Sequence, residues 1–402
     1  TTAAFASRDD AGLVAAALDL GSNLATQNFS GSMRAGTTAL AQACAAGTHT
    51  LVVASDARLA KSASPQELAY GHGAAALWVA PVSSGHAALA QILGVAHLAA
   101  DFVDHYRMAG EDFDYALEER WVRDEALAKF PAQAIAQVLA SSGVAAAEVQ
   151  HLVMPGSAAA IKRVAHSAGL TAARPADTLH ADCGDTGAGH PLLMLAALLE
   201  RARPGETILV VGFGQGVDAL LLRAGAGLAT RSATPVATAL ARRCEEAQYL
   251  RYLSHSGLVN VDFGMRAERD NRTAQSVAWR KRRATSAFVG GLCTRCNTAQ
   301  FPLSRVCVNP QCRATDTQQE HRFADSAGRI KTFTEDWLAY SARPPFCYGN
   351  VAFAEGGNLL MEFTDVGAGE LAVGDALRFV FRIKDIARQR NFRRYFWKAA
   401  KV

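Results

Sequence analysis

Four cysteines near the end of the chain constrain its folding more than any other feature. Cys293 and Cys296 form a CxxC pair, ten residues follow, and Cys307 and Cys312 form a second pair. Two such pairs joined by a hairpin can place four thiolates around a tetrahedral ion, the closed geometry of a structural zinc site. Four residues separate the second pair instead of the usual two, so we expect a wider loop that Pro310 stiffens. Because the segment has little apolar core, metal binding would contribute much of its folding free energy.

The composition is that of a globular protein with more than one domain. With 402 residues, the chain exceeds the size at which one core usually keeps growing. Hydrophobic residues make up 50% and charged residues 19%, which excludes a disordered chain, and no apolar stretch is long enough to suggest a membrane span. The eight cysteines are too few for a disulfide scaffold. Four of them cluster in sequence, which fits a metal site in a protein from a reducing compartment. We therefore predict a cytoplasmic protein.

Strands and helices alternate over the first half of the chain. Ser30-Gly31-Ser32 offers an N-cap for a predicted helix that Gly47 can close, and a buried strand follows at residues 51–53. The same order returns at 151–170, where a strand precedes a helix, and at 184–222, where a helix opened by Pro191 precedes strands at 207–211 and 219–222. This alternation predicts a layered α/β domain.

The residue composition and the predicted elements change in the second half of the chain. Residues 232–288 are basic and partly helical, and we interpret them as a connector. After the cysteines, short alternating runs at 330–334, 349–353, 359–363 and 376–383 are typical of strands, with Gly356-Gly357 as a hairpin turn. About five short strands indicate a small barrel such as an OB-fold. The predicted domains are 1–231 (α/β), 232–288 (connector), 289–320 (zinc ribbon) and 321–402 (OB-fold).

Several blocks of the α/β region resemble one enzyme superfamily. Residues 32–40, 51–56, 71–77, 184–191 and 211–216 are together similar to the thiolase superfamily, closest to hydroxymethylglutaryl-CoA synthase and ketoacyl synthase III. Residues 285–397 resemble the zinc-ribbon and OB-fold proteins that accompany thiolase-like acyl-CoA enzymes. The resemblance implies a layered αβαβα domain that is N-terminally incomplete, since the chain opens inside the first half of that fold.

The resemblance also implies where catalytic groups should lie, and this chain departs from that pattern. The family's nucleophilic cysteine, at a helix start that favours a thiolate, matches Met33, and the family's histidine matches Met154. A thioether can neither ionise nor carry an acyl thioester. The synthase carboxylate would fall at Thr1-Thr2, and the ketoacyl synthase asparagine matches Asp185.

Two interpretations of the pocket follow. In the favoured one, the chain is a pseudo-enzyme subunit of a complex that forms or cleaves carbon-carbon bonds in acyl-CoA. Its zinc-ribbon and OB-fold module bridges the partners and aids acyl-CoA binding. In the other, the chain is an active enzyme of Claisen or retro-aldol type that uses other groups. The candidates for those groups are Ser30, Ser32, His72, Cys183, Asp185 and His190.

The ligand and partner predictions depend on the same resemblance. Gly214 and Gly216 belong to a loop that can offer backbone amides to a thioester oxygen, and Arg280 and Arg282 could contact the adenosine phosphates of coenzyme A. We expect a homo-oligomer that also assembles with a catalytic thiolase subunit.

A nucleic-acid-binding class remains as a further alternative. Five cations alternate with aromatic residues in the C-terminal tail, namely Arg388, Arg390, Arg393, Arg394 and Lys398 with Phe392, Tyr395, Phe396 and Trp397. The same alternation describes an edge strand with one packed face. A net charge of only +4 argues against phosphate binding as the main role.

Overall fold

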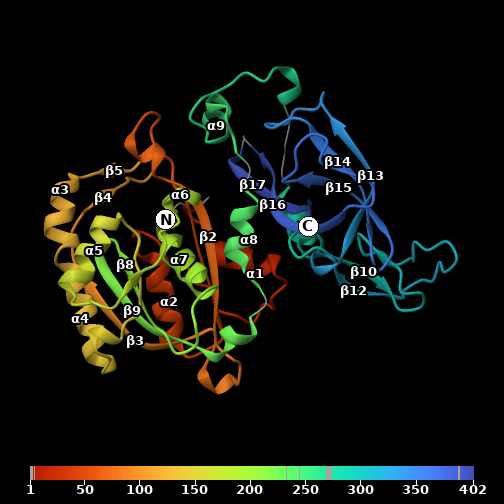
Figure 1. Cartoon of the computed structure of the whole chain (residues 1–402). Helices are drawn as coiled ribbons and strands as arrows, with labels where there is room; N and C mark the ends of the chain where they lie inside the picture. Colours follow the sequence, from red (N-terminus) through yellow and green to blue (C-terminus); the bar gives the residue numbers. More distant parts are fainter. Residues whose placement is uncertain (1–2, 4, 232, 244, 269–273, 388–389) are drawn as a thin grey trace. The chain divides into compact units, whose positions relative to one another are not determined.

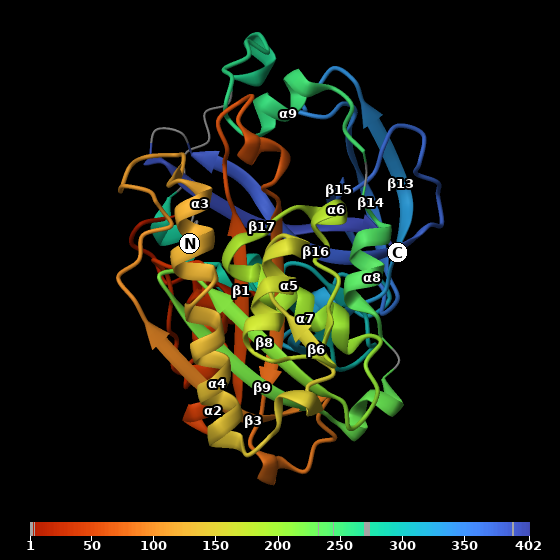
Figure 2. The same cartoon turned by 60° about the vertical axis from the view of Figure 1, so that its left-hand side comes forward.

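The structure of the chain is a computed structural model that describes residues 3, 5–231, 233–243, 245–268, 274–387 and 390–402. It divides into two compact units (Figures 1 and 2). Unit 1 comprises Thr1–Ala6 and Phe29–Leu258, and unit 2 comprises Ser7–Asn28 and Val259–Val402. Four residues of interest lie outside the described residues. They are Thr1, Thr2 and Arg388, which the sequence predictions name, and Cys244, one of the eight cysteines.

The strands of unit 1 form two main sheets. A mixed five-stranded sheet has the order β3-β9-β8-β6-β7, and β1 pairs with β2 in a separate antiparallel sheet. A short hairpin joins β4 and β5. The strand bounds are β1 (Thr50–Ala57), β2 (His72–Val79), β3 (Ala90–Ala99), β4 (His105–Tyr106), β5 (Tyr115–Ala116), β6 (His151–Val153), β7 (Arg174–Pro175), β8 (Thr207–Phe213) and β9 (Gly216–Ala224).

The helices of unit 1 cover both faces of the five-stranded sheet. Figure 1 shows α2 and α7 between this sheet and β2, while α4 and α5 cover the other face. The helix bounds are α2 (Ala35–Ala46), α3 (Glu119–Trp121), α4 (Phe130–Ser142), α5 (Ala158–Ser167), α6 (His180–Cys183), α7 (His190–Leu199), α8 (Pro235–Ala241) and α9 (Tyr249–His255). The described residues therefore contain four stacked layers of the predicted αβαβα arrangement.

Strand β8 explains why both faces are covered. Ile208 and Val210 pack in one core with α2 and α7, whereas Leu209 and Val211 pack in a second core with α4 and α5. Because successive strand side chains point to opposite faces, a continuous apolar run needs a layer on each side. The predicted α/β class is confirmed.

One local sequence signal is confirmed and one is wrong. Gly47 ends α2 in the left-handed conformation (φ 63°), as predicted, and Ser157 caps α5 by accepting a hydrogen bond from the Ala160 amide. The predicted cap of α2 at 30–32 is wrong, since its N-cap residue is Arg34, which makes no side-chain capping bond. Ser32 accepts a bond from the Arg34 amide instead and donates one to the Gly214 carbonyl.

Unit 2 contains a small sheet and a closed barrel. The sheet has the order β11-β10-β12, and the barrel has the cyclic order β13-β14-β15-β17-β16, in which β15 and β17 are parallel. The bounds are β10 (Val289–Cys293), β11 (Ala299–Gln300), β12 (Gln318–Arg322), β13 (Gly328–Asp336), β14 (Phe346–Phe353), β15 (Asn358–Thr364), β16 (Ala376–Ala387) and β17 (Phe392–Lys401). The helices are α1 (Asp10–Ala17), α10 (Gln275–Arg280) and α11 (Arg282–Thr285).

Strands β13 to β16 agree with the four short runs predicted from the sequence. The role predicted for the C-terminal tail, which forms β17, differs from the observed one. Gly356 and Gly357 form the predicted turn with φ of 92° and 79°. Strand β17 pairs with both β15 and β16 and closes the barrel, so the interpretation of the tail as an edge strand is wrong.

Residues 7–28 group with unit 2, unlike the predicted 1–231 domain. The Arg8 guanidinium lies 5.2 Å from the Phe392 ring centroid, and Arg322 donates a hydrogen bond to the Ala17 carbonyl. Arg283 pairs with both Asp19 and Glu320. Residues 245–258 of the predicted connector group with unit 1.

No described helix is both long enough and apolar enough to cross a membrane.

Candidate functional site

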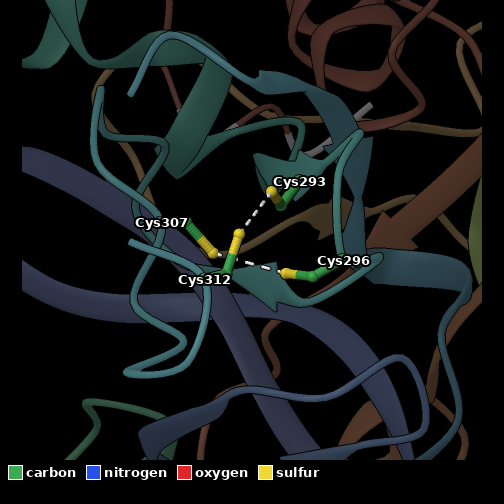
Figure 3. A group of neighbouring side chains, drawn as sticks. All are labelled: Cys293, Cys296, Cys307 and Cys312. Carbon is green, nitrogen blue, oxygen red and sulfur yellow. Dashed lines mark hydrogen bonds between the residues drawn. The ribbon is translucent and has the colours of Figure 1, made fainter. Parts of the chain in front are cut away.

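The four cysteines of unit 2 converge on one point (Figure 3). Cys293 ends strand β10, and the Sγ atoms of all four residues lie within 4.8 Å of one another. The Cys293–Cys312 and Cys296–Cys307 sulfur distances are 3.9 Å and 3.6 Å. A tetrahedral ion with bonds of about 2.3 Å to sulfur needs sulfur atoms about 3.8 Å apart. The cluster therefore fits zinc.

Hydroxyl groups and local turns hold the cysteine cluster. Thr317 Oγ1 lies 3.2 Å from Cys293 Sγ, and Thr298 Oγ1 lies 3.3 Å from Cys296 Sγ. The Thr317 contact lowers the pKa of Cys293 to about 6, whereas burial raises the pKa of Cys307 to about 12. In the wider second loop, the Asn309 side chain accepts a bond from the Gln311 amide and closes an Asx turn.

The segment that leads into α2 in unit 1 contains Met33, the residue predicted from the sequence to match the family nucleophile. Ser32 Oγ and Arg34 Nε donate hydrogen bonds of 2.6 and 3.2 Å to the Gly214 carbonyl, in the turn between β8 and β9. A Cβ atom on Gly214 would lie only 2.9 Å from the Met33 nitrogen. The structure thus brings Met33 and Gly214 together, and the close backbone approach requires glycine.

The other side of α2 contacts the segment that contains Asp185 and His190. A Cβ atom on Gly36 would lie 2.3 Å from the Ala188 carbonyl oxygen. Asp185 accepts bonds from Arg58 (3.2 Å) and from the Gly187 amide (2.9 Å). Two sequence blocks that are far apart in the chain therefore flank the first turn of α2.

The side chains of several predicted catalytic residues form hydrogen bonds within the fold. His190 is fully buried, accepts from the Thr186 amide at Nδ1 and contacts the Thr178 carbonyl through Nε2 at 2.8 Å. Burial lowers its pKa, so the ring is neutral. Cys183 donates to the Leu179 carbonyl, and burial raises its thiol pKa, which is the opposite of an activated nucleophile. His72 contacts the Arg58 carbonyl.

A trio in unit 1 has metal-compatible spacing, but most of its ligand atoms already have protein partners. Ligand atoms of His180, Asp185 and His190 lie within 4.8 Å of one another. Both ring nitrogens of His190 already contact backbone groups, and Arg58 neutralises the Asp185 carboxylate. These partners would have to be displaced before an ion could bind.

The remaining predicted residues lie in the second core of unit 1 or in unit 2. Met154 is 1% exposed and packs in the core with Ile161 and Val211, so it lines no site in the described residues. Arg280 and Arg282 are exposed in unit 2, where the Arg282 guanidinium stacks 3.9 Å from the Trp279 ring centroid. The tail cations Arg394 and Lys398 pair with Asp385 and Glu362, which leaves them engaged within the barrel.

Sequence reasoning missed a buried carboxylate beside the first turn of α2. The side chain of Asp218, on β9, is fully buried. It accepts hydrogen bonds from Arg34 (3.0 Å), Thr37 (3.0 Å) and Thr38 (2.6 Å). His97 Nδ1, directly opposite on β3, lies 2.7 Å from it. The signal that could have revealed it is an acidic residue inside the apolar run 217–222.

The Asp218 contact orients His97. Nδ1 donates to the carboxylate, which sets the orientation of the ring, and 46% of the His97 side chain is exposed. This arrangement, a carboxylate that orients a partly exposed imidazole, can serve in proton transfer.

Comparisons with known proteins agree with the fold of unit 1. Residues 139–233 match the family model of the C-terminal domain of 3-oxoacyl-[acyl-carrier-protein] synthase III. No curated protein matches the chain by sequence. The structure is similar to "MvaS in complex with 3-hydroxy-3-methylglutaryl coenzyme A", with 17% identity, coverage of 64% of this chain and 72% of that one, and a TM-score of 0.51.

Two further solved structures are similar. An HMG-CoA synthase complexed with CoA has 15% identity, coverage of 68% and 75%, and a TM-score of 0.51. The 3-oxoacyl-(acyl carrier protein) synthase III of Pseudomonas aeruginosa PAO1 has 22% identity, coverage of 56% and 74%, and a TM-score of 0.49. Unit 1 therefore has a mixed α/β fold of the thiolase-like class. Within that class it resembles ketoacyl synthase III and HMG-CoA synthase.

Proposed function

We propose that this chain is a thiolase-like subunit of a complex that forms or cleaves carbon-carbon bonds in acyl-CoA substrates, and that its own pocket does not carry the acyl group. The catalytic cysteine belongs to a second, thiolase-like chain. The zinc-ribbon and barrel unit bridges the two chains and aids acyl-CoA binding.

The residue at the start of α2 is the observation that carries this proposal. Met33 lies against the Gly214 turn, where the family nucleophile is expected, and a thioether cannot form a thioester. Ser32 and Arg34 both donate hydrogen bonds to the Gly214 carbonyl beside it. An ordered site that lacks a reacting group fits a binding or scaffolding role.

Unit 2 supports the bridging role through two structural features. Cys293, Cys296, Cys307 and Cys312 would hold a zinc ion that stabilises the ribbon and supplies no chemistry. The cyclic strand order β13-β14-β15-β17-β16 with β15 parallel to β17 is consistent with the five-stranded Greek-key barrel of an OB-fold.

Coenzyme A thioesters are the proposed ligands. Two solved structures of similar fold are described as complexes with HMG-CoA and with CoA. Backbone groups of Gly214 and Gly216 near Met33, and the exposed guanidinium groups of Arg280 and Arg282, remain the proposed contacts.

Reconstitution tests the proposal. The chain is purified from its native host with its partners, and thiolytic and condensation activities are measured for the isolated chain and for the complex. We expect turnover only with a second, cysteine-bearing thiolase-like chain. The Met33→Cys variant should then acquire an acyl group from acyl-CoA, detected by mass spectrometry, while Met33→Ser should not. Robust turnover by the isolated wild-type chain would contradict the pseudo-enzyme assignment.

A second candidate function rests on His97 and Asp218. If the chain is itself an enzyme, this pair beside α2 is the best-oriented acid-base group among the described residues of unit 1. Turnover by the isolated chain that is lost in His97→Gln would select this alternative.

A further inference from the structure

A pocket of about 240 Å³ opens on the barrel of unit 2. Phe346 and Tyr348 of β14, Leu360 of β15 and Phe396 of β17 supply most of its wall. Lys384, Lys398 and Glu362 supply its charged groups, and the Trp397 indole also lines it. Neither the zinc cluster nor the proposed coenzyme A contacts Arg280 and Arg282 belong to this pocket.

The aromatic wall follows from strand geometry. Phe346 and Tyr348 are two residues apart on β14 and therefore share a face of the strand. Their ring centroids are 5.6 Å apart with an interplanar angle of 34°. Tyr348 lies directly opposite Glu362 of β15. The result is a partly exposed aromatic surface beside polar groups.

A β-bulge explains why a lysine reaches this surface. The register between β16 and β17 shifts between the pairs Ile383–Tyr395 and Asp385–Arg394, which leaves Lys384 as the extra residue. Bulges redirect a side chain relative to the regular alternation of the strand. The Lys384 ammonium lies 5.3 Å from the Phe396 ring centroid, at the pocket.

The charges of the pocket do not cancel. Lys398 Nζ lies 2.8 Å from Glu362 Oε2, so this pair is neutral overall. Lys384 has no ion-pair partner among the residues that the structure describes, and it gives the pocket one net positive charge.

This combination defines a class of ligand. Aromatic side chains bind planar bases by stacking, and a lysine binds phosphate as a point charge. An alkyl chain would not use the lysine, and an inorganic anion would not use the rings. The volume is below the roughly 300–1,000 Å³ of sites that enclose a whole drug-sized ligand, so it suits one base with a nearby phosphate.

We propose that the barrel pocket binds a purine nucleotide, with the base stacked on Phe346 and Tyr348 and a phosphate at Lys384. The nucleotide is either free or the adenosine end of coenzyme A. The proposal goes beyond the acyl-CoA function above and does not depend on it, because a free nucleotide satisfies the same contacts.

Calorimetric titration of the full-length, zinc-loaded chain tests the site. The ligands are adenosine 3′,5′-bisphosphate, coenzyme A, pantetheine and a short single-stranded oligothymidine. We expect the first two to bind with similar Kd and pantetheine not to bind. Lys384→Gln and Tyr348→Leu should each weaken binding about tenfold. Lys331→Gln should change Kd less than twofold, because Lys331 is the extra residue of another bulge in the same barrel and lies outside the pocket.

The outcomes separate this proposal from the proposed function. Binding of the bisphosphate but not of coenzyme A, with sensitivity to Lys384→Gln, supports the pocket and contradicts the acyl-CoA function. Binding of coenzyme A that is insensitive to both pocket variants overturns the pocket and leaves the acyl-CoA function standing. No nucleotide binding, or binding of the oligonucleotide alone, overturns the proposal. Circular dichroism and zinc content identify any variant that fails to fold.

Discussion

At the scale of single residues, Asp218 shows how a charge can be buried without being isolated. Its carboxylate is fully shielded from solvent and is satisfied by one guanidinium, two hydroxyl groups and one imidazole. A buried polar group is tolerated only when its hydrogen bonds are complete. The contacts fix the first turn of α2 against β9 and orient His97 at the same time.

Replacing Asp218 tests this account. Asp218→Ala removes a buried acceptor shared by Arg34 and two threonine hydroxyl groups, and we expect the free energy of unfolding of unit 1 to fall by about 3–5 kcal/mol. Urea denaturation measures the loss. Asp124→Ala is the control, since Asp124 forms ion pairs of similar kind but is 44% exposed, and it should change stability by less than about 1 kcal/mol. Equal effects of the two variants would show that the Asp218 cluster is not a buried network.

His190 should make the stability of unit 1 depend on pH. Burial lowers its pKa in the folded state, so the unfolded chain binds a proton that the folded chain resists. The stabilisation is present above the ordinary histidine pKa of about 6.5 and is lost as the pH falls below it. We expect the free energy of unfolding to decrease between pH 7 and 5.5, measured in urea.

A matched pair of variants isolates the His190 contribution. His190→Gln should be less stable than wild type at pH 8 and should show a flatter pH dependence. His255→Gln replaces an exposed histidine of the same unit and should keep the wild-type slope. An unchanged slope in His190→Gln would assign the pH dependence to other groups.

At the scale of elements, the convergence of the four cysteines could be predicted from their spacing, because residues close in sequence need only local turns to meet. The cluster of side chains around the start of α2 could not be predicted in the same way. Met33, Gly214, Asp218 and His97 come together only through the pairing of β3 with β9 and the packing of α2, which are contacts between distant segments. A single amino-acid sequence does not specify which distant segments pair.

The strand that closes the barrel illustrates the same limit. The alternation in β17 predicted a strand with one packed face, and the structure confirms a strand there. Its pairing with β15, which is parallel and distant in sequence, makes it an interior strand. Alternation reports which side chains are buried, but the number of neighbouring strands depends on topology.

The ribbon should depend on metal for its fold. We expect about one zinc per chain by elemental analysis, and less than about half an equivalent would count against the site. Cys312→Ser should lose most of the metal, because three thiolates leave the coordination incomplete. Cys183→Ser, a variant of a cysteine in unit 1, should retain it. Chelation should increase protease cleavage between residues 289 and 322 while unit 1 stays resistant.

At the scale of the whole molecule, the grouping of residues 7–28 with unit 2 means that the chain order of the two units is interleaved. The sequence placed this segment in the α/β domain because it precedes that domain's first block. The contacts that contradict this placement, Arg8 on the Phe392 ring and Arg322 on the Ala17 carbonyl, join residues more than 300 positions apart. No periodicity or spacing signals a contact of that kind.

Calorimetry can test the interleaving directly. Two units with separate cores should give two unfolding transitions, since such a chain need not unfold in one step. Chelation of zinc should lower the Tm of one transition, and Asp218→Ala should lower the other. Arg8→Ala removes a cation-aromatic contact worth about 0.5–2 kcal/mol and should shift the zinc-dependent transition by a few degrees, although Arg8 precedes the whole of the α/β core in sequence. If Arg8→Ala instead shifts the transition that responds to Asp218→Ala, residues 7–28 fold with unit 1 and the interleaved arrangement is wrong.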